Sequence, residues 1–174
     1  MRAALVVVLA ALGCRPAHEE SLPPVEPPVL PLTPSKHKDG EVLDANVPLA
    51  DGGVLALPSL RGKVVILELC DAAHRDASAE ADYTALAQSS GDALAIVMVA
   101  LDRDGWHDDA PPHTLGWDPQ GALAARLRAA TLPTVLVLDA QGRIAYQYGG
   151  ARASGHADVL ATAQRLLSSG TQQR

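Results

Sequence analysis

Three side chains able to do thiol or acid–base chemistry, Glu68, Cys70 and His74, lie close together in the sequence. The apolar run 63–69 leads into Cys70, a short polar loop follows, and a helical pattern starts at Ala77. A strand, a loop and a helix in this order commonly frame a redox site with two cysteines spaced Cys-x-x-Cys. In this stretch the two residues with that spacing are His74 and Ala77. The loop therefore has the setting of a thiol–disulfide site without its pair of sulfurs.

Cys70 and His74 leave two interpretations open. In the first, Cys70 is a lone reactive thiol, His74 is its base and Glu68 helps to manage protons, so that the protein is a monothiol redox enzyme. In the second, Cys70 is a small buried hydrophobic residue, as an unpaired cysteine usually is. A carboxylate in an apolar run needs a partner, solvent or a proton. Glu68 is therefore either a proton-handling group or an acid paired with a local donor.

The same residues are candidate metal ligands. Cys70 and His74 could be joined by His107 or His113 from the acidic loop 102–113, and thiolate and imidazole suit copper or zinc. The set lacks the paired spacing of a strong metal motif, and a solvated, charged loop is the alternative. No carboxylate is placed by the sequence to orient His74, and G-x-S-x-G is absent, so acyl transfer is not expected. We expect no cofactor.

The segments around this loop alternate between strand and helix patterns. Near-continuous apolar runs predict strands covered on both faces. The predicted order is a hairpin over 47–57, a strand over 63–69, a helix over 77–88, a strand over 93–102, a helix over 120–130, a strand–turn–strand unit over 134–148 and a helix over 154–167 that Ser154 could cap. The apolar stripe of the first helix comprises Ala79, Tyr83, Leu86 and Ala87. This order predicts an α/β domain with a central mixed sheet.

Composition limits the classes of function. The 174 residues carry a formal net charge of −6 and no basic run occurs, which argues against nucleic-acid binding. Aromatic residues make up 3% and phenylalanine is absent, so the core has to be built from Leu, Val, Ile and Ala. The chain is long enough for one domain and extensions.

The first 40 residues have the features of an export signal and a tether. A short positive start and a ten-residue apolar stretch lead to Cys14, so residues 1–13 resemble a bacterial lipoprotein signal that is cut before a lipid-carrying cysteine. An ordinary secretory signal is the alternative. Residues 14–40 hold seven of the 13 prolines and predict an extended spacer. We therefore expect an exported domain, 41–170, that faces the periplasm or exterior and is held to an envelope membrane by lipid at Cys14.

Two longer stretches resemble a known family. "LPSLRGKVVILEL" and "TLPTVLVLDAQGRI" are similar, in order and spacing, to stretches of the membrane-tethered thioredoxin-like proteins of the TlpA/ResA group. The resemblance covers about 41–168. It implies a thioredoxin-like fold, in which a central mixed β-sheet has helices on both faces and an N-terminal β-hairpin. It also implies that Pro133 is the family's cis-proline.

The resemblance does not extend to the family's redox chemistry. In the register set by "GKVVILEL", the family's two cysteines correspond to His74 and Ala77, which implies that disulfide reductase activity is absent. Glu68 matches a buried carboxylate that handles protons in thioredoxin, and Cys70 stands where the family usually has Trp. A comparison with peroxiredoxins places Ser78 near the peroxidatic position, and a serine cannot reduce a peroxide.

Binding is the function that these expectations favour. In the thioredoxin-like fold, the loop before the cis-proline pairs with an extended peptide or partner strand through main-chain hydrogen bonds. We expect a groove formed by His74, Ala77, Leu132 and Pro133 that binds a protein or peptide of the envelope, or that serves as a scaffold. The alternatives are a monothiol redox protein that uses Cys70 and a copper or zinc carrier.

Overall fold

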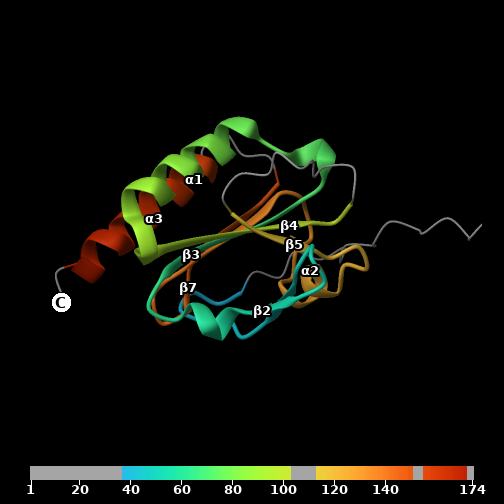
Figure 1. The fold of residues 1–174 in the computed structure, drawn as a ribbon, viewed down its shortest axis with the longest axis horizontal. Helices are drawn as coiled ribbons and strands as arrows, with labels where there is room; N and C mark the ends of the chain where they lie inside the picture. Colours follow the sequence, from blue (N-terminus) through green and yellow to red (C-terminus); the bar gives the residue numbers. More distant parts are fainter. Residues whose placement is uncertain (1–36, 103–112, 151–154, 172–174) are drawn as a thin grey trace, which may run out of the picture.

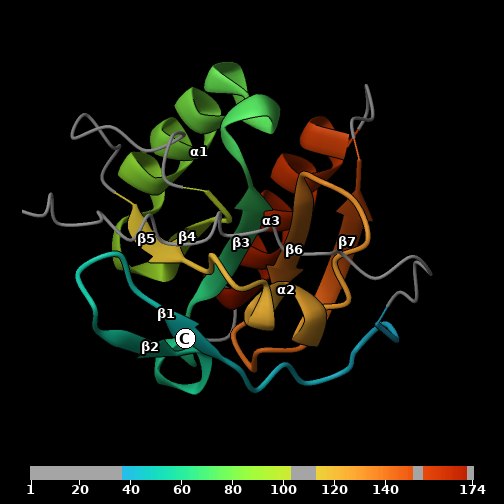
Figure 2. The same cartoon turned by 90° about the vertical axis from the view of Figure 1, so that its right-hand side faces the viewer.

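A five-stranded mixed sheet forms the centre of the structure, a computed structural model that describes residues 37–102, 113–150 and 155–171. In the order β5-β4-β3-β6-β7, the first three strands are parallel to one another, and β6 and β7 are antiparallel to their neighbours (Figures 1 and 2). The strands are β3 Val64–Cys70, β4 Leu94–Ala100, β5 Thr114–Trp117, β6 Thr134–Leu138 and β7 Ile144–Gly149. The predicted central mixed sheet is confirmed.

β3 lies in the middle of the sheet, and all seven of its residues are buried. Alternate side chains reach opposite faces of a sheet. Leu67 and Leu69 join the hydrophobic core on one face, and Ile66 joins the core on the other. A strand covered on both faces has to be apolar almost throughout, which explains the run 63–69. Glu68, which shares the parity of Ile66, is the one charged residue of this strand.

Two long helices, α1 Ala77–Ser90 and α3 Gly155–Thr171, cover one face of the sheet (Figure 1). Both helices contribute to a hydrophobic cluster with the side chains of that face. The stripe predicted for the first helix is confirmed, because its members are buried or partly buried in this cluster. These are Ala79, Tyr83, Leu86 and Ala87.

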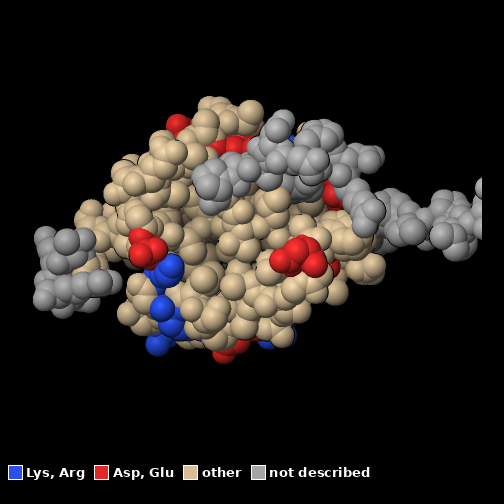
Figure 3. Space-filling model, viewed as in Figure 1, with Lys and Arg blue, Asp and Glu red and all other residues tan. Residues whose placement is uncertain are grey.

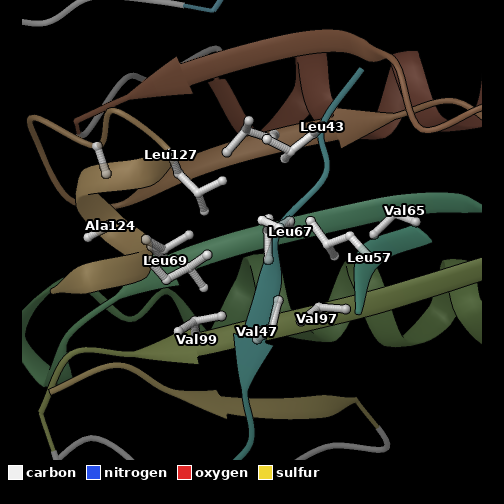
Figure 4. Packing of buried hydrophobic residues seen from close by; sticks show 14 of the residues in the cluster. Leu43, Val47, Leu57, Val65, Leu67, Leu69, Val97, Val99, Ala124 and Leu127 are labelled. Carbon is white, nitrogen blue, oxygen red and sulfur yellow. The ribbon is translucent and has the colours of Figure 1, made fainter. Parts of the chain in front are cut away.

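An N-terminal hairpin and a short helix cover the opposite face. The hairpin comprises β1 Asn46–Pro48 and β2 Val54–Ala56, and the 3-10 turn η1 Leu57–Leu60 follows it. The helix is α2 Ala122–Arg126. Figure 4 shows side chains of these segments packed on the central strands. The predicted helices on both faces and the N-terminal hairpin are confirmed.

The segment 40–50 pairs with both outer strands of the sheet. At one edge, the Ile144 N–H of β7 donates to the Glu41 carbonyl at 2.9 Å. At the other edge, the Ala50 N–H donates to the Leu115 carbonyl of β5 at 3.0 Å. Exposed edge strands pair readily with other chains, so this segment protects both edges at these positions.

β5 is a strand that the sequence does not predict. It has only four residues, and one of them is Gly116, a residue type that is depleted in strands. The structure explains the glycine, because an added Cβ at this position would lie 2.8 Å from the Val47 side chain of the hairpin. The close approach of two backbones is a tertiary requirement that a strand pattern does not reveal.

The bounds of one helix also differ from the prediction. The helix predicted over 120–130 covers only Ala122–Arg126, because the chain turns at Arg128, which has a φ of 53° in the left-handed region that ends helices. Contacts of the domain begin before residue 41, since the His37 N–H donates to Gln147 Oε1 at 3.1 Å.

Several predicted features fall outside the described residues. These are the signal 1–13, Cys14, most of the tether 14–40 and the cap Ser154. Within the described ranges, no helix combines the length and the apolar character needed to cross a bilayer.

Candidate functional site

Two aspartates fix the loop that follows β3. The 3-10 turn η2 Ala72–His74 begins at Asp71, whose Oδ1 accepts a hydrogen bond from the His74 N–H at 2.9 Å. Asp102, which lies beyond the end of β4, accepts from the Ala72 N–H at 3.2 Å. Because each carboxylate holds a main-chain group, the loop at the predicted site is preorganised.

Asp76 and an Arg75–Glu80 ion pair set the start of α1. Asp76 Oδ1 accepts from the N–H groups of Ser78 and Ala79 at 2.9 and 3.2 Å, which caps the helix. The Arg75 guanidinium binds the Glu80 carboxylate through two hydrogen bonds of 2.7 and 2.6 Å. Sequence reasoning missed this pair, because a separation of five residues lies outside the usual helical spacings.

His74 is an exposed histidine held by a carboxylate. Its Nδ1 lies 2.5 Å from Asp71 Oδ1, and 45% of its side chain is exposed. This corrects the expectation that no carboxylate orients His74. The two residues are three apart in a 3-10 turn, where side chains at i and i+3 are eclipsed. The spacing of Asp71 and His74 is visible in the sequence, but the 3-10 turn that brings their side chains together is not.

Cys70 lies at the end of β3 and is fully buried. Burial, and then the nearby Glu68 carboxylate, raises the pKa of the Cys70 thiol well above its usual range. The thiolate is the reactive form of cysteine, so a buried thiol with a raised pKa is unreactive in the folded state. No hydrogen bond between Cys70 and His74 occurs among the described residues, and the His74 imidazole is bonded to Asp71 instead. The geometry favours the interpretation of Cys70 as a small core residue.

Glu68 is buried under α1, with 4% of its surface exposed. Burial is the main cause that raises its pKa to about 7, and the Glu80 carboxylate adds to the effect, whereas the Tyr83 hydroxyl opposes it. Glu68 Oε2 and the Tyr83 hydroxyl have no hydrogen-bond partner of good geometry within the described part of the chain. Glu68 is therefore a buried acid that holds its proton close to neutral pH, rather than one paired with a strong donor.

The loop before β6 lies at the same end of the sheet as the η2 loop. The antiparallel register pairs Leu69 of β3 with Thr134 of β6, and the Leu132–Pro133 peptide bond just before it is cis. The cis bond agrees with the resemblance noted in the sequence. The Pro133 carbonyl accepts from the Gly150 N–H at 2.9 Å, whereas the main-chain groups of Leu132 bond to no residue that the structure describes.

Solved structures of known proteins share the fold of this chain. No protein-family model and no curated protein matches the chain. A protein from Chlorobium tepidum assigned as the thiol:disulfide interchange protein DsbE is 21% identical, with a TM-score of 0.62 over 76% of this chain and 99% of that chain. A secreted thiol-disulfide isomerase from Corynebacterium glutamicum is 22% identical, with a TM-score of 0.59 over 74% and 86%. An exposed lipoprotein thioredoxin from Streptococcus pneumoniae is 19% identical, with a TM-score of 0.54 over 71% and 100%.

The fold is thioredoxin-like. Identities of this size establish the fold and leave the activity open. The predicted fold class is confirmed.

The candidate metal ligands of this thioredoxin-like domain are not brought together. His113 packs on α1, where its Nε2 lies 3.1 Å from the Thr84 hydroxyl, and burial lowers its pKa. Cys70 is buried in the sheet, and His107 lies outside the described residues. In the described ranges, no three His, Cys, Asp or Glu side chains are grouped so as to hold a metal ion.

Two surface pockets of the domain lie away from the η2 loop. One of about 470 Å³ lies between the hairpin and α2, and Asp118 and Arg126 contribute to its lining. Another of about 480 Å³ lies near the C-terminal part of α3, with Asp92 and Asp139 in its lining. Neither pocket is lined by the four predicted groove residues.

Proposed function

We propose that this protein is an exported, lipid-anchored thioredoxin-fold module that lacks dithiol exchange and binds an extended protein or peptide segment. The groove is formed by His74, Ala77, Leu132 and Pro133. Two features at one end of the sheet carry the proposal. The main-chain groups of Leu132 bond to no described residue, and the positions that the resemblance assigns to cysteines hold His74 and Ala77.

Loss of dithiol chemistry is supported by the state of Cys70. A disulfide exchange cycle needs an attacking thiolate and a second cysteine that resolves the mixed disulfide. Cys70 is fully buried with a raised pKa, and His74 and Ala77 hold the two positions that the resemblance assigns to cysteines. The structural neighbours are named as thiol–disulfide proteins, so this chain would keep their fold while differing in chemistry.

Peptide binding is supported by the main chain around the cis-proline. An extended segment adds to a protein by pairing with main-chain donors and acceptors that are not already bonded. The outer strands of the sheet are paired with the segment 40–50, whereas the N–H and C=O groups of Leu132 have no partner among the described residues. Leu132 is therefore a position where such pairing can begin.

An envelope location is supported by the N-terminal sequence and by the names of two neighbours. Residues 1–13 and Cys14 have the pattern of a lipoprotein signal and its lipidated cysteine. One neighbour is described as an exposed lipoprotein and another as secreted. The proline-rich residues 14–40 would then hold the domain at a distance from the membrane.

A titration with an unfolded chain tests binding at the groove. The probe is S-carbamidomethylated insulin B chain, which is extended and has no free thiol, added to the isotope-labelled full mature protein. We expect NMR shift changes centred on His74, Ala77 and Leu132. Ala77→Trp places a bulky side chain at the exposed start of α1 and should abolish them, whereas Ala85→Trp, exposed two turns later, should not. Shift changes that are insensitive to Ala77→Trp would refute the groove.

A further inference from the structure

His74 differs from the other histidines that the structure describes. The rings of His37, His113 and His156 are buried or partly buried: His37 lies against Glu41, His113 against Thr84 and His156 against Asp82. The His74 side chain is 45% exposed, and only its Nδ1 is bonded. The Nε2 of His74 has no partner among the described residues, so it is available to a ligand at the groove.

The Asp71 carboxylate determines which nitrogen of His74 carries hydrogen. An ionised carboxylate only accepts hydrogen bonds, so the Nδ1 that lies 2.5 Å from Asp71 Oδ1 must be the donor. In a neutral imidazole, the other nitrogen then has a free lone pair. Asp71 also accepts from the His74 N–H, so the ring and its backbone are both held. In the neutral ring, Nε2 is therefore a hydrogen-bond acceptor that Asp71 holds in place.

The charges near this acceptor favour a cationic donor. Asp71, Asp76 and Asp102 are all in the loop or at its ends, and the Arg75 charge is bound by Glu80 through two hydrogen bonds. On the face in Figure 3, most Lys and Arg side chains lie on the side where Figure 1 places β2, away from α1. A lysine ammonium has three donors, no acceptor and a positive charge.

We propose that Asp71 and His74 form the specificity-determining pair of the groove, and that the bound segment presents a lysine whose ammonium donates to His74 Nε2. Asp71 acts as a positioning residue, because it contacts the segment only through the histidine. This inference rests on the proposed function, since it names the side chain that the groove recognises in an extended segment.

Two peptides that differ in one side chain test the proposal. Capped Thr-Val-Lys-Val-Thr and its norleucine counterpart have the same backbone and nearly the same aliphatic stem. We expect the lysine peptide to bind the full mature protein about ten-fold more tightly, as a hydrogen bond to a charged group predicts. Equal affinities would overturn the lysine inference and leave the groove standing. Binding of neither peptide would overturn the groove and the inference together.

Asp71→Ala tests the role of the aspartate. It removes the oxygen that lies beside both the His74 N–H and Nδ1, so the hydrogen is no longer fixed on Nδ1 and Nε2 is no longer held as an acceptor. We expect the preference for lysine to disappear while the norleucine peptide binds as before. His156→Gln, at the histidine bonded to Asp82, is the matched control and should keep the preference.

The ring itself provides a readout that is independent of affinity. The ¹⁵N shifts of His74 should report hydrogen on Nδ1 in the native protein and hydrogen shared between the two ring nitrogens in Asp71→Ala. Hydrogen on Nε2 in the native protein would overturn the proposal, as would a lysine preference that survives in Asp71→Ala.

Discussion

Glu68 and Cys70 lie two residues apart on β3, and burial governs the chemistry of both. In an interior of low polarity, the charged form of each group is disfavoured, so both pKa values are raised. The sequence allowed the burial to be predicted, since both residues adjoin or interrupt a near-continuous apolar run. It could not distinguish a paired Glu68 from a protonated one, because that depends on Tyr83 and Glu80 from α1.

Glu68 should make the stability of the protein depend on pH. Its folded pKa of about 7 lies above the ordinary value of 4.5, so the folded state holds the proton more tightly than the unfolded state. The contribution is complete below pH 4.5 and is lost as pH rises through 7, by about 3 kcal/mol in the free energy of unfolding. Urea unfolding at pH 5 and pH 8 should show this loss, and Glu68→Gln should remove it. If the free energy of unfolding changed with pH in the same way in both proteins, Glu68 would not be the group responsible.

Cys70 should resist thiol reagents in the native state. Its side chain has no solvent access and its pKa is raised, so Ellman's reagent should react only as fast as the domain opens. In strong denaturant the thiol should react fully. Cys70→Ala gives the background from any other thiol. Rapid stoichiometric labelling of the native protein would restore the monothiol interpretation.

The contact between Asp71 and His74 is a feature of the site that the sequence did not predict. Their spacing is visible in the sequence, yet it brings the two side chains together only in the 3-10 turn η2. That turn depends in part on Asp102, thirty residues away, which holds the Ala72 N–H. The pair was therefore not predictable from local pattern alone.

At the scale of elements, long periodic segments were predicted well and short ones were not. α3 and the central strands have strong apolar patterns that tertiary contacts only complete. β5 has four residues and a glycine required by the hairpin, and α2 is ended by the turn at Arg128. Contacts with neighbouring segments determine where β5 and α2 begin and end, and the local sequence does not reveal those contacts.

The start of α1 should depend on its aspartate cap. Asp76→Ala removes the acceptor for the Ser78 and Ala79 N–H groups and should lower the free energy of unfolding by about 1 kcal/mol. Chemical denaturation at neutral pH measures the loss. Asp92→Ala, an exposed aspartate in η3 with no cap hydrogen bond, is the matched control and should change stability little. Equal losses in the two variants would show that the cap contributes nothing.

At the scale of the whole molecule, the segment 40–50 connects the two edges of the sheet. It pairs with both outer strands and supplies part of the hairpin that covers one face of the sheet. The chain is thus part of the domain from His37 onward. The proposed groove lies elsewhere, in the loops at the carboxyl end of β3.

The reduction of insulin by dithiothreitol is the most direct test of a thioredoxin-like fold without dithiol exchange. The full mature protein should leave the rate at background, and Cys70→Ser should change nothing. The double substitution His74→Cys and Ala77→Cys restores the two thiols in the same loop and serves as the positive control, with turnover expected. Turnover by the native protein that disappears in Cys70→Ser would contradict the account.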